Sequence, residues 1–162
     1  MDSDQIKRIL KKCPQENNCF IGVFSCDKLP KIKKIPCCFI ANTDPSYLSG
    51  EHWIAIYVVN KSTADYFDSF GQPPENKHFK KFLSQFQNYN YNSTCIQGSD
   101  TTVCGQYCVI FLISRQIGYE MDLIIERLHA NENVITRDVA VCALVNALAD
   151  LNLPVADIEL LL

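Results

Sequence analysis

The spacing of hydrophobic residues along the chain predicts a mixture of short strands and helices. Short apolar or alternating runs bounded by turn residues predict strands over residues 37–42, 52–60, 64–67 and 89–96. Apolar residues three and four positions apart predict helices over residues 2–12, 76–88, 104–117, 120–128 and 134–151, with a short helical tail over 155–162. Residues 13–36 are broken by prolines and are predicted to be rich in loops. This order of elements predicts an α+β fold, a small and mostly antiparallel sheet flanked by helices.

Two of the predicted helices have candidate N-caps. Ser3 or Asp4 is placed to cap the first helix, and Thr101 or Thr102 to cap the helix over 104–117. Cys104 would then lie in the first turn of a largely apolar and buried helix.

Length and composition are those of one folded domain spanning residues 1–162. The chain is 48% hydrophobic and 20% charged, which excludes a disordered protein. No apolar run approaches the roughly 18–20 residues of a membrane span, so no contact with a membrane is expected. The first residues, MDSDQIKRILKKC, lack an apolar signal core, and we expect a protein that is not secreted.

Basic residues are concentrated near the N-terminus. Residues 1–34 carry eight Lys or Arg and four Asp or Glu, a net +4, whereas the remaining residues carry a net −7. Such a segment is either a DNA-contacting surface or a solvated, lysine-rich one. The basic residues are Lys7, Arg8, Lys11, Lys12, Lys28, Lys31, Lys33 and Lys34.

The nine cysteines indicate a reducing compartment rather than a disulfide framework, because their number is odd and no leader precedes them. They form no C-x2-C pair, and no histidine is suitably spaced to complete a zinc site. We therefore expect neither a metal nor another cofactor.

Two residues at strand ends are candidates for acid–base chemistry. His52 opens the predicted strand over 52–60, and Asp68 closes its partner. If these strands form a hairpin, the start of one lies beside the end of the other. A carboxylate bonded to one imidazole nitrogen would then fix the histidine tautomer and stabilise the imidazolium.

Cys104 is the candidate nucleophile, although a cysteine in this position is otherwise read as a small buried hydrophobe. A helix N-terminus and an adjacent imidazolium would both favour its thiolate. Gln97 could donate an N–H to the oxygen of a tetrahedral intermediate, together with the backbone N–H of Cys104. Gly105 would let substrate approach, and Trp53 would shield the site or touch substrate.

Taken together, His52-Trp53, Asp68 in YFDSFG, Gln97 and Cys104-Gly105 resemble the pattern of the adenain family. Adenains are processing cysteine proteases of the adenovirus type and are distantly related to SUMO-deconjugating proteases. The similarity runs from about residue 20 to residue 111. It implies an adenain- or SUMO-protease-like fold with His52 as general base, Asp68 as its orienting carboxylate, Gln97 as oxyanion donor and Cys104 as nucleophile.

The resemblance implies an endopeptidase that cleaves viral or mobile-element precursor proteins, usually after glycine, during virion maturation. It implies a location in the virion and in the host nucleus or cytoplasm. DNA, through residues 7–34, and an activating peptide are further candidate partners, although no cysteine aligns securely with the one that links such a peptide. Two alternatives stay open: an isopeptidase that removes a ubiquitin-like modifier, and a non-catalytic module that binds DNA or protein.

Overall fold

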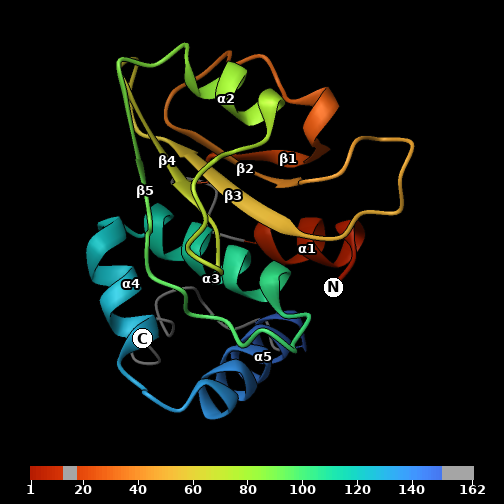
Figure 1. The fold of residues 1–162 in the computed structure, drawn as a ribbon, viewed down its shortest axis with the longest axis vertical. Helices are drawn as coiled ribbons and strands as arrows, with labels where there is room; N and C mark the ends of the chain where they lie inside the picture. The colour runs from red at the N-terminus through yellow and green to blue at the C-terminus, as the bar shows by residue number, and fades with distance from the viewer. Residues whose placement is uncertain (13–17, 151–162) are drawn as a thin grey trace.

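The computed structural model describes residues 1–12 and 18–150, which form one five-stranded sheet with helices on both faces (Figure 1). The strands are β1 (Phe20–Ser25), β2 (Cys37–Asn42), β3 (Trp53–Val58), β4 (Thr63–Phe67) and β5 (Asn88–Tyr91). The helices are α1 (Ser3–Leu10), the 3-10 turn η1 (Cys26–Lys28), α2 (Lys77–Leu83), α3 (Cys104–Gln116), α4 (Met121–His129) and α5 (Val134–Asp150).

The strands follow the order of the sequence, β1-β2-β3-β4-β5. The three central strands pair antiparallel, and each edge strand pairs parallel to its neighbour. The α+β prediction is confirmed. The prediction of loop over residues 13–36 is wrong for β1, whose sequence FIGVFS has no clear alternation and whose Gly22 (φ 145°) lies at an irregularity in the pairing with β2.

Alternate residues of the central strands point into two separate hydrophobic cores. Ile40, Ala55 and Phe67 face a core built with α1, α3, α4 and α5. Their neighbours in the strands, such as Phe39 and Ile56, face a smaller core covered by α2 and η1. This period of two sets which side chains face the larger core and which face the smaller one.

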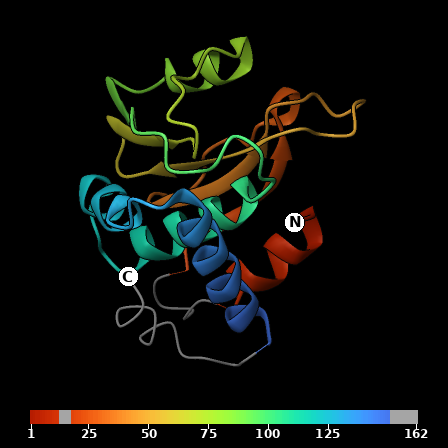
Figure 2. The same cartoon turned by 60° about the horizontal axis from the view of Figure 1, so that its bottom comes forward.

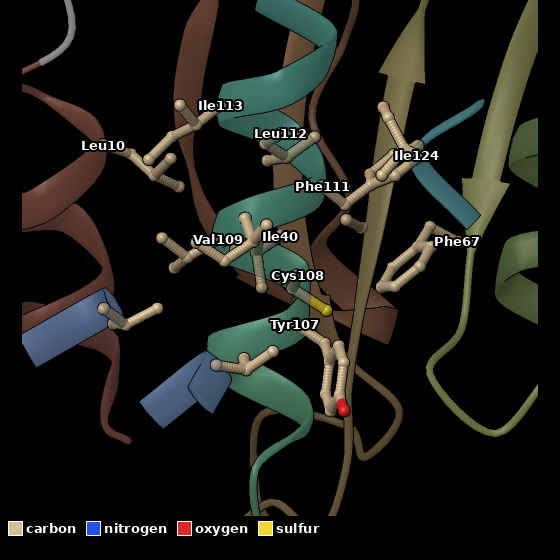
Figure 3. Packing of buried hydrophobic residues seen from close by; sticks show 14 of the residues in the cluster. Leu10, Ile40, Phe67, Tyr107, Cys108, Val109, Phe111, Leu112, Ile113 and Ile124 are labelled. Carbon is tan, nitrogen blue, oxygen red and sulfur yellow. The ribbon is translucent and has the colours of Figure 1, made fainter. Parts of the chain in front are cut away.

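Helix α3 lies at the centre of the larger core, and every residue of it except Gln106 is buried. In Figure 3, Cys108 and Phe111 lie near Ile40 of β2 and Phe67 of β4, whereas Val109 and Ile113 lie toward Leu10 of α1. The rings of Phe67 and Phe111 stack with centroids 4.4 Å apart. Figure 2 shows α5 packed along the side of α3 away from the sheet. Helix α3 is therefore held on several sides, which fixes the position of its first residue.

Several predicted element ends are corrected. Asp2, not Ser3 or Asp4, caps α1, because its carboxylate accepts the backbone N–H groups of Asp4 and Gln5 in a capping box. Val103 precedes α3 without a side-chain cap, so neither Thr101 nor Thr102 has that role.

Two elements end well before their predicted limits. Strand β5 ends at Tyr91 and helix α2 at Leu83. The predicted tail over 155–162 lies outside the described residues. In the part of the chain that the structure describes, no helix is both long and apolar enough to cross a membrane.

Candidate active site

The β3–β4 hairpin brings His52 and Asp68 together, as the sequence predicted. Ala55 pairs with Phe67, so the residue just before β3 lies beside the residue just after β4. His52 Nε2 lies 3.0 Å from Asp68 Oδ1. The same oxygen accepts the backbone N–H of Phe70 at 2.8 Å, and the Phe70 ring lies 5.1 Å from the imidazole, centroid to centroid. The imidazole is thus held at one nitrogen and along one face, which leaves Nδ1 for a second partner.

That partner is Cys104, the first residue of α3. The imidazole of His52 also interacts with the thiol of Cys104, and each of the two groups shifts the pKa of the other. One turn later, Cys108 donates its S–H to the backbone carbonyl of Trp53 at 3.3 Å, which ties the start of β3 to α3. The arrangement therefore brings residues from the two ends of a hairpin to the N-terminus of a buried helix.

The electrostatics favour a thiolate–imidazolium pair. Burial lowers the pKa of His52, but hydrogen bonds to Asp68 and Cys104 and the attraction of both groups outweigh it and raise the pKa to about 9. Burial raises the pKa of Cys104, but His52 and the backbone amides of Trp53 and Gly105 outweigh it, and the pKa is lowered. The N-terminus of α3 acts in the same direction. Both shifts act in the same sense, since each favours the ion pair in which the proton lies on His52 and the sulfur is a thiolate.

Gln97 is buried, and both ends of its side-chain amide are bonded. Its Oε1 accepts the hydroxyl of Ser69 at 2.7 Å, and its Nε2 donates to the carbonyl of Thr101 at 2.7 Å. An amide NH₂ carries two hydrogens, so one is left for a substrate oxygen. Gln97 lies in the loop between β5 and α3, not at the end of a strand as predicted, because β5 ends at Tyr91.

Trp53 and Gly105 pack against each other beside Cys104. A Cβ at Gly105 would lie 3.2 Å from Trp53 Cδ1 and 3.3 Å from Met1 Cβ. Trp53 also donates its indole N–H to the carbonyl of Met1 at 3.2 Å. The missing side chain of Gly105 thus makes room for Trp53 and Met1. That it also lets substrate approach Cys104 stays a prediction.

Sequence reasoning missed Asn92, which holds Asp68 in place. The Asn92 amide accepts the backbone N–H of Asp68 at 2.9 Å and donates to its carbonyl at 2.6 Å. Gly71 closes the same turn at φ 70°, where a Cβ would lie 2.7 Å from the carbonyl carbon of Thr94. The NYNYN repeat gave no signal that one asparagine is buried.

The basic residues of the N-terminal segment are divided between the two faces of the sheet. Helix α1, which carries the first basic residues, packs into the larger core. Leu29, Ile32 and Ile35, which lie among the lysines of residues 28–34, pack against the smaller core. Among the described residues, no group of three His, Cys, Asp or Glu side chains is placed to hold a metal ion.

No protein-family model matches the chain, and no curated protein matches it. Among solved structures, the central domain of the uncharacterized Lpg1148 protein from Legionella pneumophila is similar over 93% of this chain and 98% of that domain, with 14% identity and a TM-score of 0.55. The similarity at this identity shows a common fold.

A partial match is the ASFV pS273R protease, over 56% of this chain with 25% identity and a TM-score of 0.37. This chain spans 39% of the length of that protease. At this TM-score the match carries no function over to this chain.

Proposed function

We propose that this protein is a cysteine endopeptidase with Cys104 as nucleophile, His52 as acid and base, Asp68 as the carboxylate that orients His52, and Gln97 as oxyanion donor. The single observation that carries the proposal is the linked pair of contacts at His52, to Asp68 Oδ1 at 3.0 Å and to the Cys104 thiol. These contacts favour the thiolate, which is the reactive form of cysteine.

The reaction follows from these positions. The Cys104 thiolate attacks the carbonyl carbon of a peptide bond, and the oxygen that becomes negative is met by the free N–H of Gln97 and the backbone N–H of Cys104. The His52 imidazolium gives its proton to the leaving nitrogen as the C–N bond breaks, leaving a thioester. Neutral His52 then takes a proton from water, and the resulting hydroxide releases the acid and restores the thiolate–imidazolium pair.

A groove beside Trp53 supports an extended polypeptide as substrate. Its volume is about 470 Å³, and its walls include Phe24 of β1, Asn42 of β2 and both Leu48 and Gly50 of the loop before β3. This space fits a few residues of an extended chain. We propose that the substrates are viral or mobile-element precursors cleaved after glycine, in the virion and in the host nucleus or cytoplasm. DNA is proposed as a partner on the positive charge of residues 7–34 together with the resemblance, and an activating peptide on the resemblance alone.

The first test is alkylation of each cysteine by iodoacetamide as a function of pH, followed by mass spectrometry. Cys104 is expected to react with an apparent pKa below the ordinary value, and His52→Ala is expected to return it to that of a free thiol. Cys108 is the internal control, because burial raises its pKa and the reagent cannot reach it. A Cys104 that titrates as a free thiol in the native chain contradicts the proposal.

The second test separates substrate classes. Peptides with glycine before the scissile bond are offered to the same preparation, alongside a ubiquitin-like protein carrying a C-terminal electrophile. Cleavage of the peptides supports an endopeptidase, whereas capture of the modifier without peptide cleavage supports an isopeptidase.

A further inference from the structure

Helix α5 supplies a buried carboxylate, Asp138, that the proposed chemistry does not use. Asp138 is 4% exposed, and its carboxylate bonds to the loop that runs from β5 to α3. Figure 1 shows α5 beside this loop. Its Oδ2 accepts the backbone N–H of Gly98 at 3.1 Å and the hydroxyl of Thr101 at 2.7 Å. Its Oδ1 accepts the hydroxyl of Tyr107 at 2.7 Å. One carboxylate thus connects the loop, α3 and α5.

The two loop residues bonded to Asp138 flank the proposed oxyanion donor. Gly98 follows Gln97 directly, and Thr101 is the residue whose carbonyl holds the Gln97 amide at 2.7 Å. Gly98 is also packed closely, since a Cβ there would lie 3.0 Å from Asp138 Oδ2. Any shift of Asp138 would therefore be passed to the residues on both sides of Gln97.

Arg137, the neighbour of Asp138 on α5, fixes the peptide unit before Gln97. Its Nε donates to the carbonyl of Ile96 at 2.7 Å, and the N–H on the other side of that peptide donates to the carbonyl of Ser69 at 3.1 Å. Tyr107 O–H is also within 3.1 Å of the Ile96 carbonyl, but its single proton goes to the nearer, charged acceptor on Asp138. The peptide unit between Ile96 and Gln97 therefore has a hydrogen-bond partner both at its carbonyl and at its N–H.

We propose that Asp138 is a positioning residue for the oxyanion hole, which it supports through Gly98 and Thr101 to place the Gln97 amide. The proposal rests on the proposed function, because it concerns the step in which Cys104 attacks a carbonyl. It adds a requirement that lies outside the segment resembling adenains: the catalytic geometry depends on the C-terminal helix. A small displacement of an oxyanion donor is expected to slow that step strongly, since removal of one such donor costs about 10²–10³-fold.

The test compares two reactions of the same thiolate. Alkylation by iodoacetamide displaces iodide and forms no oxyanion. Acylation by N-acetylglycine p-nitrophenyl ester forms a tetrahedral oxyanion, then the thioester and p-nitrophenolate. Both are followed at Cys104 by mass spectrometry, and Cys104→Ala gives the background. The ratio of acylation to alkylation reports the oxyanion hole, whereas damage to the thiolate pair lowers both rates.

Asp138→Ala is expected to lower this ratio at least tenfold and to leave the alkylation rate and its pH profile within about twofold. Asp138→Asn keeps an acceptor toward the loop and is expected to restore most of the ratio. Thr101→Val removes one hydroxyl with little change in shape, and a severalfold fall is expected. Asp65→Asn is the matched control, since Asp65 is an equally buried carboxylate on β4 that contacts the far end of α3.

The effect of Asp138→Ala should vanish in a Gln97→Ala background, because both changes act on the same donor. An unchanged ratio in Asp138→Ala, or a full effect in the Gln97→Ala background, overturns the proposal. If Asp138→Ala does not fold, Thr101→Val takes its place in the test. An unchanged ratio of acylation to alkylation in Thr101→Val then overturns the proposal. Failure of the proposed function has a different signature: Cys104 of the native chain then shows neither acylation nor a lowered pKa.

Discussion

The two ends of helix α3 each hold a buried cluster of charged groups, and the two clusters differ in what their charges can do. At the N-terminal end, Cys104 is bonded to His52, which is bonded to Asp68. At the C-terminal end, Arg115 lies 2.9 Å from Asp65 and 2.9 Å from Glu120. The two ends are about 16 Å apart along the helix axis, at about 1.5 Å per residue.

Both clusters follow the helix dipole, with a thiolate at the positive end and a guanidinium at the negative end. They differ in proton affinity. At neutral pH the proton held by His52 can be passed to a leaving group, whereas the guanidinium of Arg115 does not lose its proton in a protein. A buried ion pair at a helix end therefore serves chemistry only where its partners exchange a proton.

The cost of burial is visible at Asp65. Burial raises the pKa of Asp65 despite Asn90 and Arg115, which act to lower it. The Arg115–Asp65 contact is also poorly aligned, because Asp65 Oδ2 makes no hydrogen bond within the described residues. Arg115 lies over the Tyr57 ring as well, at 4.8 Å. This end of α3 is expected to matter for folding and not for the rate of reaction.

The largest expected effect is that of Cys104→Ala on catalysis. Cleavage of a glycine-containing peptide should fall by at least about 10⁴-fold, because the nucleophile is removed. Cys108→Ala is the matched control one turn along the same helix, and its kcat/KM should stay within a few-fold of the native value. Circular dichroism would check that both variants fold. Equal losses in the two variants would contradict the difference between active and structural positions on α3.

At the other end, Arg115→Met should destabilise the protein by about 3–5 kcal/mol, because it leaves Asp65 buried without its cation. The kcat of the folded fraction should not change. The free energy of unfolding would be measured in urea, and the double variant Arg115→Met with Asp65→Asn should recover part of the loss. A fall in kcat without a fall in stability would reverse the roles assigned to the two ends.

Asp68→Asn should alter the pH profile at the N-terminal end only. In the proposed mechanism protonated His52 is the acid, so kcat/KM should decrease as pH rises through about 9. Asp68 helps to raise the pKa of His52, and without it this alkaline limit should move to lower pH, with a loss of about 10²-fold at neutral pH. The profile would be measured with a peptide substrate. An alkaline limit that stays in place would show that Asp68 does not set the proton affinity of His52.

The same comparison shows what the sequence could predict. The His52–Asp68 contact was predictable because two apolar strands and a short turn define a hairpin, and the two residues flank it. The place of Cys104 in the first turn of α3 was predictable from the apolar helix that begins there. These are local patterns, and each of them has a strong periodic signal.

The buried polar contacts around the site and at the far end of α3 were not predictable from the sequence. Asn92, Asp138 and the Arg115–Asp65 pair act across long sequence distances, and none lies in a periodic pattern that indicates a partner. The missed strand β1 belongs to the same class, because its position depends on parallel pairing with β2 and not on its own alternation. Sequence patterns reveal faces of elements, whereas buried polar partners depend on tertiary packing.

The smallest expected effect distinguishes the two carboxylates bound to Arg115. Glu120 contacts Arg115 at the same 2.9 Å as Asp65, but its side chain is 83% exposed, whereas that of Asp65 is 3% exposed. Water and salt screen the exposed pair, so Glu120→Gln should change the free energy of unfolding by less than about 1 kcal/mol, with no effect on kcat. Urea unfolding at low and high salt would measure it, with Asp122→Asn as a control on the same helix. A loss as large as that of Arg115→Met would mean that Glu120, and not the buried Asp65, is the partner that makes Arg115 necessary.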